Sequence, residues 1–182
     1  MEIILIRHGK PTGATNPKLT AREFALWVRK YNHSEIVVDS EPPEQLKAEL
    51  HDHYVVSSDL RRSVHSAIKC LSKEPEVKLK NLREFDIPRY KIPFLLRANH
   101  WLILSRILWL LGITSRVESY KDAKSRAKDS ALTLAALAED KRKLAVFGHG
   151  LVNRAIAREL EKCGWSCINK SSSYWGVTRL KL

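Results

Sequence analysis

The sequence has few cysteines and no long uninterrupted apolar run. Three Cys among 182 residues cannot all form pairs, which excludes a disulfide framework and favours a reducing compartment. The longest apolar stretch, residues 101–113, contains Ser105 and Arg106 and falls short of the ~20 residues that a membrane-spanning helix needs. Charged Glu2 precedes a short apolar run that ends at Arg7, so no signal peptide is expected. We therefore expect a cytoplasmic protein without a membrane span.

Acidic residues are also scarce. The chain has 20 Asp and Glu against 32 Lys and Arg, a net charge of +12, and residues 89–126 hold eight bases and two acids. Such a cluster is typical of a nucleic-acid surface, an anion-attracting rim or a solvated helix face. Because Trp27, Trp101 and Trp109 fall on apolar helix faces rather than among the bases, nucleic acid is not the favoured partner.

The apolar pattern alternates between strands and helices. Short β-branched runs predict strands, and longer amphipathic stretches predict helices between them. Strands are expected at 3–6, 54–57, 77–80, 144–147 and 175–180. Helices are expected at about 20–31, 43–51, 58–71, 97–111, 117–138 and 151–161. We predict a single domain, 1–182, with an α/β three-layer sandwich fold: a mostly parallel central sheet with helices on both faces.

Two of the expected strands end in a histidine flanked by glycine. Arg7-His8-Gly9 follows the first strand, and Gly148-His149-Gly150 follows the fourth. In an open parallel sheet, ligands bind beyond the carboxyl ends of the strands. The glycines allow backbone to approach a ligand closely, and the helix after Gly150 offers amide donors to an anion. The two His are therefore candidates for one shared site.

The second strand leads into a segment with two arginines. Ser58 is expected to cap the helix that follows, with Leu60, Val64, Ile68 and Leu71 on its core side. Arg62 is then rotated away from the core and reaches over the strand ends. Arg61 is the competing candidate. Arginine suits an oxyanion site, because its planar guanidinium grips two phosphoryl oxygens.

Taken in order, these motifs resemble those of the histidine phosphatase superfamily, the phosphoglycerate-mutase-like group of cofactor-independent phosphatases and phosphomutases. The resemblance spans residues 7–154, apart from the unmatched segment 85–117. It rests on Arg7-His8-Gly9, Ser58-x-Leu60-x-Arg62-Ser63, Leu82-x-Glu84 and Gly148-His149-Gly150 followed by Asn153-Arg154.

The resemblance implies a role for each catalytic candidate. His8 is the implied nucleophile and forms a phosphohistidine. Arg7, Arg62 and His149 are implied to surround the transferring phosphoryl group and to balance its charge. Glu84 is the implied general acid, with Asp86 as the competing carboxyl group. No metal and no cofactor are implied. The candidate substrate-binding residues are Gly9, Lys10, Asn16, Ser58, Gly150 and Arg89.

The sequence departs from the mutase-like pattern after the first motif. Lys10 and Pro11 stand where those members usually carry an acid or amide, and Asn16 lies further along than expected. Lys10 adds positive charge at the mouth of the site, which favours an anionic substrate. We therefore expect a metal-independent phosphomonoester hydrolase acting on a small phosphorylated substrate. The alternatives are a phosphomutase, a protein phosphohistidine phosphatase, or a basic binding domain on a degenerate scaffold.

The unmatched segment, about 85–117, is interpreted as a helical cap insert. Its helix, 97–111, is apolar around most of its circumference. That pattern is compatible with burial against the rest of the fold, with a homodimer contact, or with an interfacial membrane helix, in that order of preference. A lid that contacts an apolar part of the substrate is a further alternative.

Overall fold

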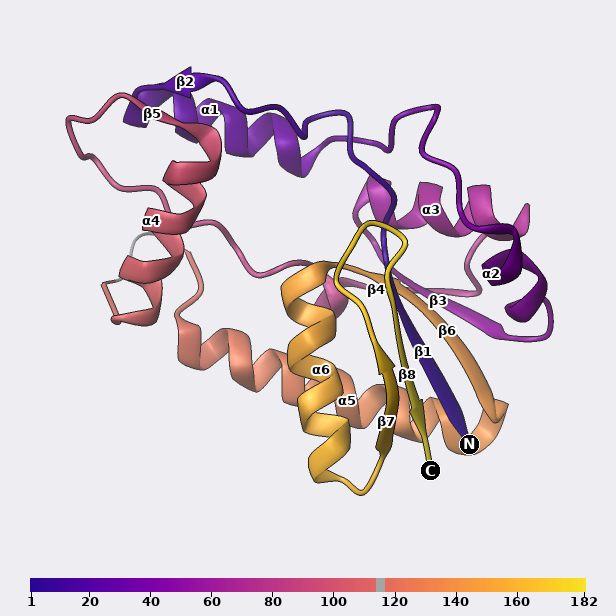
Figure 1. The fold of residues 1–182 in the computed structure, drawn as a ribbon. Coiled ribbons are helices and arrows are strands. Elements are labelled where there is room, and N and C mark those ends of the chain that lie inside the picture. Colours follow the sequence, from indigo (N-terminus) through magenta and orange to yellow (C-terminus); the bar gives the residue numbers. More distant parts are fainter. Residues whose placement is uncertain (114–116) are drawn as a thin grey trace.

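The computed structural model describes residues 1–113 and 117–182 and is built around a six-stranded sheet (Figure 1). The strand order is β4-β3-β6-β1-β8-β7. The first four strands in this order run parallel to one another. β8 pairs antiparallel with β1, and β7 pairs antiparallel with β8. The strand bounds are β1 Glu2–Arg7, β3 Tyr54–Ser58, β4 Val77–Leu79, β6 Lys143–Gly148, β7 Ser166–Lys170 and β8 Val177–Lys181. The mostly parallel sheet predicted from the sequence is confirmed.

Helices cover both faces of this sheet, which makes the predicted three layers. Successive residues of β1 point to opposite faces: Ile3 and Leu5 pack with α5 and α6, whereas Ile4 and Ile6 pack with α2 and α3. The helix bounds are α1 Ala21–Asn32, α2 Glu44–Glu49, α3 Arg61–Leu71, α4 Ala98–Leu110, α5 Tyr120–Lys141 and α6 Gly150–Lys162, with a short 3-10 helix, η1, at Lys80–Leu82.

The pairing of β1 with β6 brings the two histidine motifs together. Arg7 lies opposite Gly148 in the parallel register, and the His8 N–H donates to the Gly148 carbonyl at 3.1 Å. His8 and His149 are the next residues along each strand. They therefore leave the sheet side by side at its carboxyl edge, although 141 positions separate them in the chain.

Helix α3 differs from the prediction in its start and in its buried face. It begins at Arg61, and the Ser58 hydroxyl accepts a hydrogen bond only from the Leu60 N–H, at 3.4 Å, rather than from the helix itself. The predicted core residues Leu60, Val64, Ile68 and Leu71 are only half-buried. The buried residues are Arg62, Ser63, Ser66, Ala67 and Cys70.

The polar face of α3 is buried because it completes hydrogen bonds at the strand ends. The Ser63 hydroxyl donates to the Phe147 carbonyl at 2.5 Å. The Ser66 hydroxyl accepts from the Gly9 N–H at 2.9 Å and donates to the Arg62 carbonyl. Buried backbone groups need hydrogen-bond partners. This need, rather than the apolar spacing, decides which face of α3 is buried. The predicted orientation of Arg62 away from the core is therefore wrong, whereas its predicted reach to the strand ends is correct, since its Nε contacts His8.

A second lobe stands beside the sheet and has a core of its own. We call it the cap lobe; it consists of α1, α4 and the two-stranded sheet of β2 (Lys18–Leu19) and β5 (Leu96–Arg97). Phe24, Val28, Ile87 and Trp101 form its core. The predicted insert thus supplies only part of the lobe, because α1 and β2 come from the N-terminal segment. Residues 114–116 of the insert lie outside the described residues.

Three strands of the structure have no counterpart in the prediction. β2 and β5 have two residues each, too few for an apolar pattern to be visible. β7 is mostly exposed, so its residues lack the apolar alternation that marks a buried strand. The last strand begins at Val177 rather than at residue 175, because Trp175 has a φ of 58°. No helix among the described residues combines the length and apolar character needed to cross a membrane.

Candidate active site

His8 is held in one tautomer by the backbone beside it. It follows β1 directly and is 2% exposed. Its Nδ1 lies 2.7 Å from the Gly9 carbonyl oxygen. A carbonyl can only accept a hydrogen bond, so Nδ1 carries the proton. The Nε2 lone pair is then free, and it accepts a hydrogen bond from Nε of Arg62 at 3.3 Å.

His8 is also kept neutral. Burial is the largest cause, followed by the nearby cations Arg62 and Arg7, and together they lower the pKa of His8 to about 3. A neutral imidazole with an unprotonated Nε2 is the form that attacks phosphorus. The site therefore holds its candidate nucleophile in the reactive state throughout the neutral pH range.

Arg62 is a buried cation that has no carboxylate partner among the described residues. It is 1% exposed. Besides His8, its Nη1 donates to the carbonyls of Tyr31 and Asn32 at 3.3 and 3.4 Å, and its guanidinium lies 5.0 Å from the Tyr31 ring centroid. Burial lowers the pKa of Arg62. An unpaired buried guanidinium is costly, and an anionic ligand would supply the missing counter-charge.

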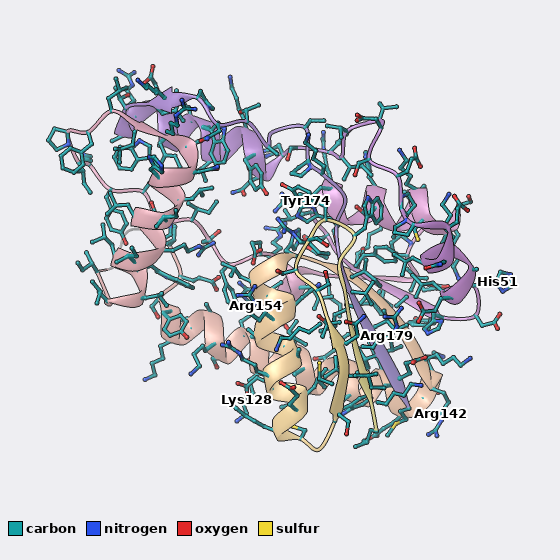
Figure 2. The ribbon with its side chains drawn as sticks, viewed as in Figure 1. His51, Lys128, Arg142, Arg154, Tyr174 and Arg179 are labelled. Carbon is teal, nitrogen blue, oxygen red and sulfur yellow. The ribbon has the colours of Figure 1, made fainter. Side chains whose placement is uncertain are left out.

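Arg7 reaches the same region from the end of β1. Its Nη1 donates to the Ser172 carbonyl at 2.6 Å, and its guanidinium lies 4.4 Å from the Tyr174 ring centroid. Its Nε is buried without a hydrogen-bond partner among the described residues. Figure 2 shows Tyr174 at the tip of the loop that joins β7 to β8. The Ser172 carbonyl and the Tyr174 ring of this loop thus hold the Arg7 guanidinium in place, and its Nε–H remains available to a ligand.

His149 completes the group. It is fully buried at the start of α6, and its ring centroid lies 5.1 Å from that of His8. Neither ring nitrogen has a hydrogen-bond partner among the described residues. Burial, then Arg62 and His8, lower its pKa well below the usual range. A neutral ring keeps one N–H, so His149 offers a further unused donor beside the nucleophile.

Glu84 lies across the site at the N-terminus of α6. Its two carboxyl oxygens accept hydrogen bonds from the N–H groups of Leu151 and Val152, each at 3.1 Å. The first turn of a helix has free N–H groups and a partial positive charge, which hold a carboxyl group in place. The competing Asp86 is exposed, and its carboxyl group accepts no hydrogen bond from a backbone N–H of the described residues. Glu84 also lines, with Arg62 and Tyr31, a cleft of about 360 Å³.

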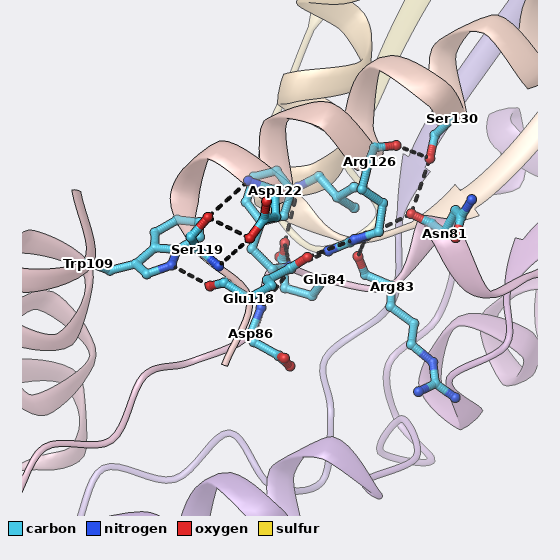
Figure 3. A network of polar contacts seen from close by, with 12 residues as sticks. Asn81, Arg83, Glu84, Asp86, Trp109, Glu118, Ser119, Asp122, Arg126 and Ser130 are labelled. Carbon is cyan, nitrogen blue, oxygen red and sulfur yellow. Dashed lines mark hydrogen bonds and ion pairs between the residues drawn. The ribbon is translucent and has the colours of Figure 1, made fainter. Parts of the chain in front are cut away.

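A half-buried ion pair holds the segment that carries Glu84 (Figure 3). Arg126 of α5 pairs with Glu118 through two hydrogen bonds. Its Nη1 also donates to the carbonyls of Asn81 and Arg83, at 2.7 and 2.8 Å. One guanidinium therefore fixes the backbone just before Glu84. Sequence reasoning missed Arg126, which had no motif to mark it.

Three of the predicted substrate-binding residues lie in the loop after β1 or at the start of α6. Gly9 has no space for a side chain, because an added Cβ would lie 2.7 Å from the Trp175 ring. Lys10 is exposed, with its N–H donating to the Ser40 hydroxyl. Gly150 opens α6, where an added Cβ would lie 3.5 Å from Arg7. Their contact with substrate stays a prediction.

The other three are placed differently. Ser58 is buried, with its hydroxyl on the Leu60 N–H. Asn16 accepts a hydrogen bond from the Asn99 N–H at 3.0 Å, so it caps the first turn of α4 within the cap lobe. Arg89 is half-buried in the segment between η1 and β5. Substrate contact by these residues also stays a prediction.

The sequence missed the aromatic and hydroxyl groups that support the histidine loop. Tyr31 and Tyr174 lie against Arg62 and Arg7, and the Ser40 hydroxyl accepts from both the Lys10 N–H and the Trp175 indole. All come from segments with no recognisable motif, and only the fold brings them together. Among the described residues, no group of three or more His, Cys, Asp or Glu side chains is arranged to hold a metal ion.

The fold also occurs in solved structures. The protein of open reading frame Rv3214 from Mycobacterium tuberculosis matches with a TM-score of 0.61 and 20% identity, covering 100% of this chain and 95% of that one. A phosphoserine phosphatase from Entamoeba histolytica, in complex with 3-phosphoglyceric acid, matches at 0.58 and 16%, covering 98% and 89%. A mycobacterial glucosyl-3-phosphoglycerate phosphatase, Rv2419c, with inorganic phosphate, matches at 0.55 and 16%, covering 88% and 79%. At these identities the likeness shows the fold.

Sequence comparison identifies the family. No curated protein matches the chain significantly. The family model of the histidine phosphatase superfamily (branch 1) matches residues 42–180, which is more than half of the chain. That range contains Arg62, Glu84 and His149, whereas the first motif, around His8, precedes it. The chain therefore belongs to the histidine phosphatase superfamily, and this membership supports a phosphatase or phosphomutase activity.

Proposed function

We propose that the protein is a metal-independent phosphomonoester hydrolase that works through a phosphohistidine on Nε2 of His8. The observation that carries this proposal is the state of His8. Its Nδ1 is bound to the Gly9 carbonyl, and its unprotonated Nε2 lies beside a buried guanidinium that has no carboxylate partner among the described residues. An unprotonated nitrogen next to unpaired cationic donors suits attack on a phosphate ester.

In the first step, Nε2 attacks phosphorus and the bond to the ester oxygen breaks. The phosphoryl group passes to His8, and the leaving oxygen takes a proton from the Glu84 carboxyl. Arg7, Arg62 and an N–H of His149 balance the charge on the three phosphoryl oxygens. Positioning and charge balance supply most of the rate in phosphoryl transfer, so these three donors suffice without a metal.

In the second step, water replaces the first product. The Glu84 carboxylate takes a proton from the water as its oxygen attacks phosphorus, the bond to Nε2 breaks, and inorganic phosphate leaves. Glu84 returns to its protonated form and His8 to its neutral form. The cycle therefore balances protons without any other group.

The substrate we propose is a small phosphorylated molecule with negative charge besides the reacting phosphate. Lys10 is exposed two residues after the nucleophile, and the buried Arg62 lines the cleft with no carboxylate partner among the described residues. Two of the structural neighbours are phosphatases, one of them described with 3-phosphoglyceric acid. Both observations support an anionic substrate.

The test is a phosphatase screen of the purified protein in the presence of EDTA. Sugar phosphates, nucleotides, phosphoamino acids and phosphohistidine are offered, and released inorganic phosphate is measured. We expect release from at least one small phosphomonoester, and none above background from the His8→Ala variant. Phosphoryl exchange between substrate positions without phosphate release would indicate a phosphomutase. Turnover of no substrate would overturn the proposal.

The role of Glu84 makes a prediction about leaving groups. Glu84→Gln keeps an acceptor oxygen for the helix N-terminus but cannot donate a proton to a leaving alkoxide. We expect kcat on an alkyl phosphate to fall by about 10²- to 10⁴-fold. The loss on p-nitrophenyl phosphate should be far smaller, because p-nitrophenolate leaves without a proton. Asp86→Asn is the matched control and should change neither rate. Equal losses on both substrates would argue against Glu84 as the acid.

A further inference from the structure

Exposed apolar side chains are concentrated in one stretch of the cap lobe. Fourteen large apolar side chains are exposed in the described residues, and seven of them lie between Phe94 and Ile113. Scattered exposed apolar residues are ordinary, but a cluster marks an interaction surface. The seven are Phe94, Leu95, Ile103, Ile107, Leu110, Leu111 and Ile113.

Helix α4 presents part of this cluster as one continuous face. Ile103, Ile107 and Leu110 are spaced by four and three residues, so they lie on the same side of the helix. Their exposed fractions are 59%, 50% and 56%. The opposite side, with Trp101 and Trp109, is buried. The sequence favoured burial of α4 against the rest of the fold, and only one side of the helix is buried in this way. In Figure 1, α4 and the turn before β5 form the edge of the molecule farthest from the sheet.

The same stretch is cationic. Residues 87–113 contain four Lys and Arg and no Asp or Glu. Arg106 is turned inward, donating to the carbonyls of Phe85 and Asp86. Lys91 and Arg97, by contrast, are exposed and form no ion pair with the residues that the structure describes.

The cap sheet adds to this charge. Lys18 of β2 lies directly opposite Arg97 of β5 in the antiparallel register. Like charges in that position repel each other, and Arg22, at the start of α1, is also exposed. A negatively charged partner would relieve this repulsion.

These features favour an anionic lipid surface over a second copy of the chain. A two-fold interface through this face would set cations of one subunit against cations of the other, with no acid from residues 87–113 between them. A bilayer with anionic headgroups offers negative charge above an apolar layer, which matches both properties. We propose that the outward face of the cap lobe binds anionic bilayers, lying in the interface without crossing the membrane.

Vesicle co-sedimentation tests this proposal independently of any catalytic activity. The purified chain is mixed with vesicles of phosphatidylcholine alone, or of phosphatidylcholine with phosphatidylserine. We expect binding to the vesicles that contain phosphatidylserine and about 25-fold weaker binding to phosphatidylcholine alone, because each of two surface cations contributes about fivefold. Added salt should weaken the binding, because it screens the charges.

Variants separate the two contributions. Ile103→Ser with Ile107→Ser should weaken binding by about tenfold or more, since two apolar side chains no longer enter the interface. Lys91→Gln with Arg97→Gln should weaken it by about 25-fold. The control variants remove two apolar side chains or two positive charges outside the cap lobe. They are Leu132→Ser with Ile168→Ser, and Lys121→Gln with Lys128→Gln. All four positions are exposed and lie outside the cap lobe. Circular dichroism of each variant checks that it is folded.

Three results would overturn the proposal. The first is no binding to vesicles with phosphatidylserine. The second is binding that survives either cap-lobe double variant, or that falls equally in the controls. The third is a dimer, seen by analytical ultracentrifugation, that Ile103→Ser with Ile107→Ser abolishes while vesicle binding is absent. That result would assign the face to a second copy of the chain.

Discussion

Replacing His8 with alanine is expected to lower kcat/KM for phosphate release by about 10³-fold or more. The reason is that the variant has no nitrogen to receive the phosphoryl group, and losing a nucleophile removes the covalent route altogether. Wild-type protein incubated with a substrate carrying labelled phosphate and then quenched should hold a label that is stable in base and released by acid, as a phosphohistidine is. The variant should hold none.

The exposed His51 provides the matched control for this measurement. His51→Ala also removes one imidazole, but His51 is exposed and pairs with Asp52 at the surface. Its rate and its labelling should equal those of the wild type. Labelling that persists in His8→Ala would move the nucleophile to another residue and contradict the proposed mechanism.

The second large effect is expected at Arg62. Arg62→Met should lower kcat/KM by about 10³-fold, because arginines that contact the transferring phosphoryl group contribute 10³- to 10⁵-fold. The free energy of unfolding, in contrast, should stay the same or rise. The guanidinium is 1% exposed and has no carboxylate partner among the described residues, so an apolar side chain of similar length removes a desolvation cost. Activity assays and urea denaturation measure the two quantities.

The effect of inorganic phosphate on Tm should also distinguish the wild type from Arg62→Met. A ligand at 100 times its Kd stabilises the folded state by about 2.7 kcal/mol, so saturating phosphate should raise the Tm of the wild type. Arg62→Met should lose most of that rise, because the buried cation that binds the anion is gone. A rise that persists in the variant would place the phosphate elsewhere.

The neighbouring arginine is the control on the same helix. Arg61 has an exposed side chain, 66% accessible, with Glu35 at 3.7 Å. Exposed ion pairs contribute little to stability, so Arg61→Met should change the free energy of unfolding and the phosphate effect only slightly. If Arg61→Met caused the larger loss of activity, the assignment of the two arginines would be reversed.

Helix α3 shows why the apolar pattern predicted the wrong orientation for Arg62. Apolar spacing placed Leu60 and Ile68 toward the core, which turned Arg62 outward. In the structure, Ser63 and Ser66 face the sheet instead, because they satisfy backbone groups of Phe147 and Gly9. An apolar pattern records hydrophobic burial only, and it carries no signal for hydrogen bonds that a distant strand end requires.

The cap lobe shows a second limit. The helix around Phe24 and the helix around Trp101 were each predicted from their local pattern. Their stacking at 5.5 Å, which makes one lobe from two distant segments, is a long-range contact without a local signal. Asn16 illustrates the same point, since its hydrogen bond from the backbone of α4 has no local signal in the sequence.

The sequence by itself determined the four parallel strands, their alternation with helices and the placing of His8 and His149 at strand ends. Buried parallel strands are short and apolar, and the glycine beside each of the two histidines is visible in the sequence, so these features are local. It also showed a basic chain with few acids between residues 89 and 126.

Only the tertiary structure decided which nitrogen of His8 is unprotonated and that Glu84 rather than Asp86 lies on the α6 N-terminus. It also decided that Arg62 is buried and that no carboxylate in the described part of the chain pairs with it. It also showed which cations of the cap lobe reach the surface, since Arg106 turns inward while Lys91 and Arg97 stay exposed. Each of these depends on which groups from distant segments come within hydrogen-bonding distance, and burial then determines their protonation and charge.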